Sequence, residues 1–251
     1  MDMKIKFSLK NFLFNEGILF YGIADAHHAL ASSEDISPLS ILPEAKSIIC
    51  YGVPIPRGII YAQANELALY WRYCNMTYRS LDVVSNKLSQ MLEQDGRAAF
   101  PVYSCYPWQT VNREFWGILP LVYWAERAGI GELSKCGLLV HPQYGSRILL
   151  GGVVTTRKLE PSHKLSEPVC PADCLDCVVI CPAQAIAESG KVDHNRCIRF
   201  ANSNPTLTHL LADPKVRENF SFETLVNTVS VDDHGSYACF ECVKGCPLNK
   251  K

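Results

Sequence analysis

Two dense runs of cysteine restrict this chain more than any other feature of its sequence. The first run reads C-PAD-C-LD-C-VVI-C-P from Cys170 to Pro182, and the second reads C-FE-C-VKG-C-P from Cys239 to Pro247. A single Cys197 lies between them. Cysteines at this spacing, with a proline after the last one, are typical of chains that bind iron–sulfur clusters.

The eight thiols divide into two sets of four. A [4Fe–4S] cluster takes four thiolates, and in paired runs the last cysteine of each run ligates the other cluster. The predicted first set is Cys170, Cys174, Cys177 and Cys246, and the predicted second set is Cys181, Cys197, Cys239 and Cys242. Three residues separate Cys170 from Cys174, one more than the usual spacing, so Cys170 is the ligand that departs from the pattern. Pro182 is expected to begin a helix over 182–187.

Structural zinc and disulfides are the alternatives. Two four-cysteine zinc sites would use similar pairs, but zinc sites do not require the Cys-Pro ending found in both runs. Residues 1–17 contain no apolar core of signal-peptide length, and no apolar run approaches the roughly 18 residues of a spanning helix. The expectation is therefore a soluble, cytoplasmic protein that does not contact membranes, whose twelve cysteines serve metal or redox chemistry.

Charge and length add two further expectations. Lys and Arg together number 24 against 25 for Asp and Glu, which argues against a nucleic-acid partner because phosphate binding usually needs clustered basic residues. The 251 residues suggest more than one domain, since a domain averages about 150 residues. The polar segment 158–168 is expected to link a domain over 1–160 to a smaller one over 161–251.

Apolar periodicity predicts a mixture of helices and strands ahead of the cysteines. Helices are expected at 5–16, 62–92 and 119–131, strands at 18–25, 47–55 and 97–104, and a β-hairpin over 135–156. The segment up to Pro120 is expected to be a loop. Its aromatic rings either form a core cluster or line the pocket of a flat cofactor; they are Tyr103, Tyr106, Trp108 and Trp116. Helical spacing between Cys197 and Cys239 predicts a segment that packs against the first domain.

Three stretches together resemble a known family. They are LPEAKSIICYGVPIP over 42–56, A-G-I-G-x3-K-x-G-L-L-V-x-P-x-x-G over 128–145, and the cysteine runs with their late Cys197. The chain resembles the corrinoid-dependent iron–sulfur proteins that include epoxyqueuosine reductase and the reductive dehalogenases. The resemblance implies an α+β chain, with a nitroreductase-like α/β domain of the cobalamin-binding type followed by a bacterial ferredoxin-like domain with two [4Fe–4S] clusters.

The resemblance also implies a cofactor site. The segment that matches 128–145 would lie against the corrin, and a glycine-containing turn before a hairpin does let the backbone approach a ligand closely. A helix C-cap followed by a core hairpin is the alternative for the same glycines. The residues expected at the cofactor are Gly129, Gly131, Lys135, Gly137, Leu138, Leu139, Val140, Pro142 and Gly145.

The chain departs from the family pattern in three places. Where family members commonly read G-W-x-G-K, this chain reads Gly-Glu-Leu-Ser-Lys over 131–135, and the segment 101–107 carries no acidic proton donor. Tyr106 or Tyr103 would then be the proton source. The helical extension with which epoxyqueuosine reductases hold transfer RNA is not matched.

The expected function is that of a cytoplasmic oxidoreductase. Two [4Fe–4S] clusters would pass electrons to a bound cobalamin that reduces a small organic substrate, with a ferredoxin or flavodoxin as electron donor. The alternatives are an accessory electron-transfer protein without catalysis and a transfer-RNA modification enzyme. Of the remaining cysteines, Cys50 and Cys74 are expected to be buried small hydrophobes, whereas Cys105 and Cys136 flank the expected corrin pocket.

Overall fold

An antiparallel sheet lies at the centre of the structure, a computed structural model that describes residues 2–28, 36–64, 66–94, 96–104, 108–111, 114–201 and 239–250. Its strands run in the order β1 (Phe20–Asp25), β2 (Ser47–Pro54), β8 (Ile148–Thr155) and β3 (Ala99–Val102). The two central strands pair along their whole length, from Ser47 opposite Thr155 to Pro54 opposite Ile148. This long pairing fixes the register of the sheet.

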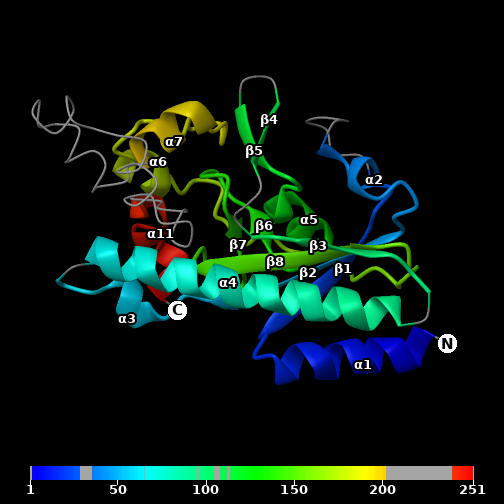
Figure 1. The fold of residues 1–251 in the computed structure, drawn as a ribbon. Helices are drawn as coiled ribbons and strands as arrows, with labels where there is room; N and C mark the ends of the chain where they lie inside the picture. Colours follow the sequence, from blue (N-terminus) through cyan, green and yellow to red (C-terminus); the bar gives the residue numbers. More distant parts are fainter. Residues whose placement is uncertain are drawn as a thin grey trace, which may run out of the picture.

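Helices cover both faces of the sheet, which explains why β2 is apolar without alternation. Ile49 and Tyr51 point into a cluster with α1 (Asp2–Asn15) and α4 (Glu66–Glu93). Ile48 and Cys50 point into the opposite cluster with α5 (Leu121–Arg127). Successive side chains of a strand face opposite sides, so a strand covered twice must be apolar at every position. The arrangement has three layers, with the sheet between α4 and α5 (Figure 1).

The long helix α4 is placed by its apolar face and by one buried hydroxyl pair. Leu81, Val84, Leu88 and Leu92 recur at helical spacing and are all buried. The hydroxyls of Tyr51 and Ser85 lie 2.6 Å apart, and Tyr51 also donates to the Leu81 carbonyl at 3.0 Å. These bonds satisfy polar groups that burial would otherwise leave costly. The short helices α2 (Pro38–Ile41) and α3 (Arg57–Ile60) complete this part of the chain.

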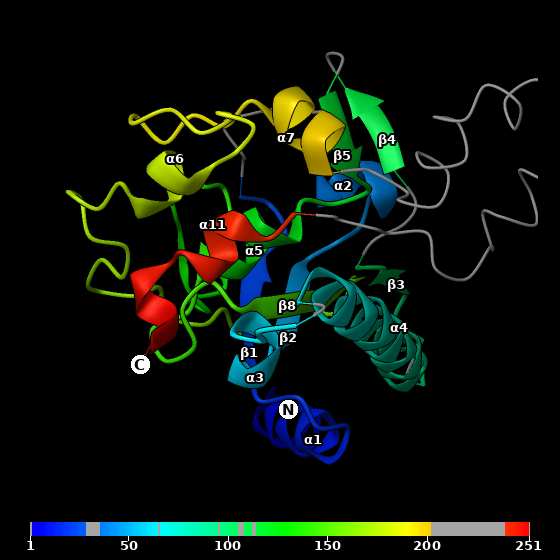
Figure 2. The same cartoon turned by 90° about the vertical axis from the view of Figure 1, so that its left-hand side faces the viewer.

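The described residues that carry the two cysteine runs, 170–201 and 239–250, lie at one end of the sheet, and we call them the cysteine segment. Its described elements are α6 (Asp176–Ile180), α7 (His194–Ala201), α11 (Glu241–Lys244) and the 3-10 helix η2 (Pro247–Lys250), and Figure 2 shows this end of the molecule facing the viewer. The ring of Phe240 stacks on Tyr70 of α4 with centroids 4.3 Å apart. Phe240 and Val243 are buried in the same apolar cluster as Leu149 of β8. The segment therefore packs directly on the sheet and on α4.

Two small hairpins complete the described structure. The strands β4 (Trp108–Val111) and β5 (Glu114–Gly117) pair with each other. The strands β6 (Glu132–Leu133) and β7 (Leu139–Val140) form the second hairpin, which we call the 132–140 hairpin.

The predicted helices before residue 130 and all three predicted strands are confirmed to within a few residues at their ends, except that α5 is shorter than expected. The predicted 135–156 hairpin is wrong, because β8 pairs with β2 and β3 whereas β7 pairs with β6. The loop expected before Pro120 contains β4 and β5.

The helix predicted over 182–187 is wrong as well. Gln184 has a φ of +48°, which interrupts a helix, and Ile186 forms a β-bridge with Val192 instead. The helical segment expected between Cys197 and Cys239 lies largely outside the described residues, and the domain division at 160/161 stays a prediction. Within the described part of the chain, no helix is both long and apolar enough to cross a membrane.

Candidate functional site: a cysteine cavity beside an aromatic pocket

The 132–140 hairpin is the element around which the site is built. Its turn is closed by Ser134, whose N–H and hydroxyl both donate to the Leu138 carbonyl, at 2.9 and 2.8 Å. Gly137 occupies the turn with a φ of +77°, a conformation that favours glycine. The turn presents Lys135 and Cys136 toward the cysteine segment.

Charged side chains of this hairpin hold the first cysteine run. The Lys135 ammonium donates to the carbonyl of Ala172 and, at 2.9 Å, to that of Cys174. The Glu132 carboxylate accepts from the N–H of Val169 and, at 2.8 Å, from that of Cys170. Bonds of this charge-assisted kind are roughly twice as strong as neutral ones. The hairpin thus fixes the loop before and after Cys170.

A small cavity gathers the predicted first set of thiols. All four of its members line this cavity, together with two further cysteines; the six are Cys136, Cys170, Cys174, Cys177, Cys242 and Cys246. The remaining wall is formed by Ser134, Val140, Pro171, Pro247 and Leu248. Residues from both cysteine runs and from the hairpin therefore meet at one point, which we call the cysteine cavity.

The predicted second set also comes together. Burial, and after it the charges of Cys239 and Cys181, raises the pKa of the Cys197 thiol. Burial likewise raises the pKa of Cys239, to which Cys181 contributes. Cys242 has both Cys197 and Cys239 as electrostatic neighbours. Cys181, Cys197 and Cys239 are therefore close to one another, and Cys242 is close to Cys197 and Cys239 while it also lines the cysteine cavity.

Cys136 lies between the two sets. Its thiol is within hydrogen-bonding reach of Cys177 in the first set and Cys242 in the second, and its Sγ lies 3.1 Å from the Ser134 hydroxyl. Hydrogen bonds from Cys177 and Cys242 hold the pKa of Cys136 well below its usual range. The same bonds, followed by burial, raise the pKa of both partners.

The donor chemistry of these cysteines suits iron–sulfur clusters. Thiolates are the protein ligands of such clusters, and each iron takes one of them, so the ligands surround the cluster instead of converging on one atom. Among the described residues, no three His, Cys, Asp or Glu side chains are grouped for a single metal ion. Sets of four neighbouring thiols fit two [4Fe–4S] clusters, and their roles as ligands stay a prediction.

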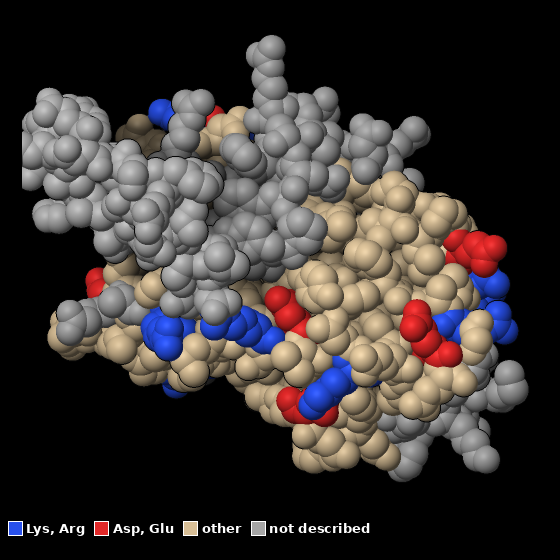
Figure 3. All heavy atoms as spheres, in the orientation of Figure 1, with Lys and Arg blue, Asp and Glu red and all other residues tan. Residues whose placement is uncertain are grey.

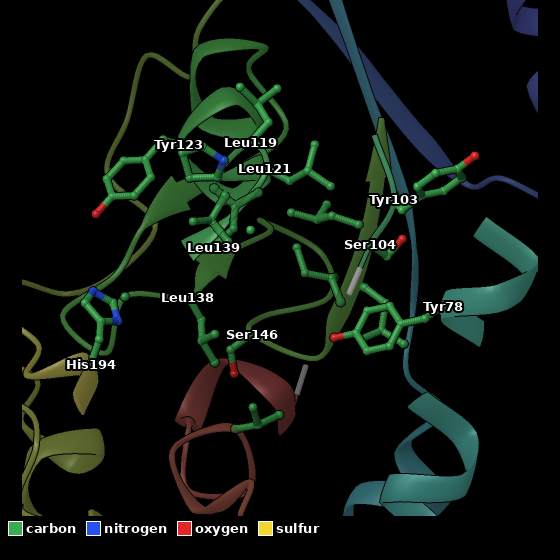
Figure 4. A pocket seen from close by; sticks show the side chains of 18 of the residues that line it. Tyr78, Tyr103, Ser104, Leu119, Leu121, Tyr123, Leu138, Leu139, Ser146 and His194 are labelled. Carbon is green, nitrogen blue, oxygen red and sulfur yellow. The ribbon is translucent and has the colours of Figure 1, made fainter. Parts of the chain in front are cut away.

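An aromatic pocket of about 320 Å³ lies on the other side of the hairpin. Figure 4 shows Tyr103 and Ser104 on one side of it and Tyr123 and His194 on the opposite side. The hairpin contributes Gly137, Leu138 and Leu139, β8 contributes Ile148, Leu149 and Leu150, and α4 contributes Tyr70 and Tyr78. The lining is mostly aromatic and aliphatic with a few polar groups, which is usual for a ligand pocket.

Of the two predicted proton donors, only Tyr103 can be placed. It lines the aromatic pocket, and its hydroxyl donates to the Asn86 side-chain carbonyl at 3.0 Å. Tyr106 and Cys105 lie outside the described residues, as do the side chains of Trp108 and Trp116.

A carboxyl group lies behind the pocket wall beside Tyr103. Asp82 of α4 accepts from the N–H of Ser104 at 2.8 Å. Burial raises the pKa of the Asp82 carboxyl above its usual value. The sequence prediction missed this residue because it looked for an acid only in 101–107, and an acid on a distant helix gives no local signal.

The residues predicted to contact the cofactor lie in several different places. Gly137, Leu138 and Leu139 line the aromatic pocket, whereas Val140 lines the cysteine cavity. Pro142 is exposed at the surface beside His141. Lys135 holds the first cysteine run.

The other three predicted residues are glycines packed against backbone. A Cβ at Gly129 would lie 2.0 Å from the His163 carbonyl oxygen, and one at Gly131 would lie 2.5 Å from that of Val140. Gly145, with a φ of +62°, faces the buried Asn249, whose Oδ1 accepts the Ser146 N–H at 2.9 Å. Internal packing accounts for these glycines, and their contact with a cofactor stays a prediction.

Comparison with known proteins identifies the relatives of the chain. Epoxyqueuosine reductase of Bacillus subtilis (strain 168) is 32% identical over 218 residues, which cover 86% of this chain and 50% of that protein. Epoxyqueuosine reductase of Synechococcus sp. (strain RCC307) is 43% identical over 128 residues, 51% of this chain and 34% of that protein. The chain thus spans about a third to a half of these relatives. No protein-family model matches it.

Solved structures share the fold. An epoxyqueuosine reductase crystallised with an epoxyqueuosine-modified stem loop of tyrosine transfer RNA has a TM-score of 0.64 at 22% identity, and the match covers 100% of this chain and 66% of that one. A catabolic reductive dehalogenase has a TM-score of 0.63 at 17% identity, covering 96% of this chain and 31% of that one. The predicted resemblance to this family and the mixed α/β fold are confirmed.

Proposed function

We propose that this chain, whose relatives in sequence and fold are epoxyqueuosine reductases, is an iron–sulfur oxidoreductase for a small organic substrate, in which two [4Fe–4S] clusters would supply single electrons and a bound cobalamin would supply the reducing chemistry. Cys170, Cys174, Cys177 and Cys246 would hold one cluster. Cys181, Cys197, Cys239 and Cys242 would hold the other. A small redox protein such as a ferredoxin or flavodoxin would supply the electrons.

One observation carries this proposal: a single hairpin separates the cysteine cavity from the aromatic pocket. Cys136 and Val140 line the cavity, whereas Gly137, Leu138 and Leu139 between them line the pocket. Among the described residues, the 132–140 hairpin thus contributes to the lining of both the cavity and the pocket. Such proximity is what electron delivery from a cluster to a bound group requires.

The pocket residues supply the environment for a planar ligand. The rings of Tyr70, Tyr78 and Tyr123 and the leucines of β8 and the hairpin offer apolar surface to such a ligand. The volume of about 320 Å³ lies at the lower end of the range for ligand pockets, about 300–1,000 Å³. A corrinoid would therefore occupy the pocket with only part of its ring.

Proton supply is assigned to the wall formed by Tyr103 and Ser104. Tyr103 and Tyr106 remain the proposed donors, and Tyr103 already lines the pocket. The raised pKa of the neighbouring Asp82 favours its protonated form, which is the form that a donor needs. Asp82 bonds the backbone of Ser104, so it can act on the pocket only through this wall.

A transfer-RNA substrate is the second candidate. The curated relatives are named epoxyqueuosine reductase, and one solved structural neighbour holds a modified transfer-RNA stem loop. The expectation of no nucleic-acid partner, drawn from a net charge of −1, is therefore not supported. On the face of the molecule that Figure 3 shows, both acidic and basic side chains occur over the described residues.

The test is an anaerobic preparation measured for iron, sulfide and corrinoid binding. We expect about eight iron atoms per chain, as two [4Fe–4S] clusters require, and a shift of the visible cobalamin spectrum at one equivalent. Leu138→Trp fills the pocket from the hairpin and should abolish the spectral shift with the iron retained. Val83→Trp, the matched control on an exposed position of α4, should leave both unchanged.

The outcomes separate the candidates. Full iron content without any corrinoid binding would contradict the reductase and favour an accessory electron-transfer protein. Salt-sensitive binding of a transfer-RNA stem loop carrying epoxyqueuosine, with turnover in the presence of reductant, would establish the second candidate. Turnover of small organic substrates alone would establish the first.

A further inference from the structure

The cysteine cavity holds more thiols than one cluster can use. A [4Fe–4S] cluster takes four thiolates, yet six cysteines line this cavity. Cys242 is accounted for by its neighbours in the second set, Cys197 and Cys239. Five thiols remain for four positions, and the additional one is Cys136 of the 132–140 hairpin.

Cys136 is held in place by the contacts of its hairpin. The closed turn of the hairpin fixes its backbone, and the Ser134 hydroxyl lies 3.1 Å from its Sγ. Its neighbour Lys135 binds the carbonyls of Ala172 and Cys174, which ties the hairpin tip to the first cysteine run. Its thiol reaches that of Cys177. A thiol within hydrogen-bonding reach of a predicted ligand can itself reach the cluster.

Two features distinguish Cys170 from the other four thiols, although the backbone N–H of Lys135 also bonds its thiol. Three residues instead of two separate it from Cys174. Its backbone N–H and that of Val169 are both bonded to Glu132, so neither is available to donate to a cluster sulfur. The Glu132 carboxylate also places a negative charge beside the thiol, and like charges repel at short range.

We propose that Cys136 is a ligand of the first cluster that shares one iron position with Cys170, so that either thiol completes the set formed by Cys174, Cys177 and Cys246. On coordination Cys136 loses its proton, as every thiol ligand does. The proposal rests on the cluster part of the proposed function and is independent of the corrinoid.

The experiment compares Cys170→Ala, Cys136→Ala and the double variant, all prepared anaerobically. Iron and acid-labile sulfide per chain are measured, together with the electron paramagnetic resonance signal that a three-iron cluster gives after oxidation. Each single variant should retain about eight iron atoms, and the double variant should lose about half of them or show the three-iron signal. Cys50→Ala, at a buried sheet position remote from the cavity, is the control and should match the unchanged protein.

Two results would overturn the proposal. Loss of as much iron from Cys170→Ala alone as from the double variant would show that Cys136 does not replace Cys170. Equal iron in the double variant and the unchanged protein would show that neither thiol is a ligand. Absence of iron from the unchanged protein would instead refute the proposed function itself, so the two failures are distinguishable.

Discussion

The Glu132 carboxylate accepts a hydrogen bond from the backbone N–H of Cys170 at 2.8 Å. Glu132 stands where family members commonly carry an aromatic residue, and Cys170 is displaced by one residue from the usual spacing. Two separate departures from the family pattern are thus in direct contact. The acidic residue satisfies the backbone of a loop that the additional residue has lengthened.

Removing the Glu132 carboxylate should loosen this loop. Glu132→Ala leaves two N–H groups without a partner and should lower the free energy of unfolding by about 1–3 kcal/mol. Iron release to a chelator should accelerate as well. Glu132→Gln retains an acceptor, so its stability and its rate of iron release should lie between those of Glu132→Ala and the unchanged protein. Glu188→Gln, at an exposed position, is the control. Equal release rates for Glu132→Ala and the unchanged protein would contradict the anchoring role.

Lys135 should control the mobility of the first cysteine run. Lys135→Met removes the bonds to the Ala172 and Cys174 carbonyls while keeping the length of the side chain. Amide hydrogen exchange at 172–177 should become faster, and exchange in β2 should not change. Lys191→Met, at an exposed position, serves as control. Unchanged protection at 172–177 would show that the ammonium contributes nothing to the order of this run.

Asn249 should be the most sensitive position near the C-terminal end of the described chain. Its fully buried amide accepts from the Ser146 N–H and donates to the Val243 carbonyl. Asn249→Ala leaves both partners buried and unpaired, at a cost of about 1–3 kcal/mol for each group. Denaturant unfolding measures the effect. A loss below about 0.5 kcal/mol, the range of ordinary surface substitutions, would show that water replaces the amide.

Asp82 should make stability depend on pH. Because burial raises its pKa in the folded protein above the unfolded value of about 3.9, Asp82 contributes stability below that value, and the contribution is lost as the pH rises through the folded pKa. Asp82→Asn keeps an acceptor for the Ser104 N–H without titrating. The stability of the variant relative to the unchanged protein should therefore rise with pH above about 4. A pH-independent difference would show that the folded pKa is not raised.

The sequence predicted those parts of the fold that local patterns specify. The continuous apolar run of β2 and the helical spacing of Leu81, Val84, Leu88 and Leu92 in α4 identified both elements. No local sequence pattern shows which other strand a given strand pairs with. Residues 148–155 were assigned to a neighbouring segment by proximity in sequence, but they pair with 47–54, almost a hundred residues away.

The site was predicted to a similar extent. Cysteine spacing predicts two sets of four thiols. The structure gathers the first set in the cysteine cavity, where Cys242 of the second set also lies, and the division into two sets stays a prediction. Cys136 belongs to neither cysteine run. It lies at the cavity because β6 pairs with β7, and the sequence does not predict this pairing. The β-branched and aromatic residues of 108–117 are a signal for the β4–β5 hairpin that the sequence analysis did not use.

The pairing of β6 with β7 decides more than the shape of one turn. Side chains of a strand change sides with every residue, and in β7 Leu139 lines the aromatic pocket while the next residue, Val140, lines the cysteine cavity. A register shift of one residue between β6 and β7 would exchange these two side chains. We therefore expect the length of 132–140 to tolerate less variation than its composition, because its length decides which residues face the cavity and which face the pocket.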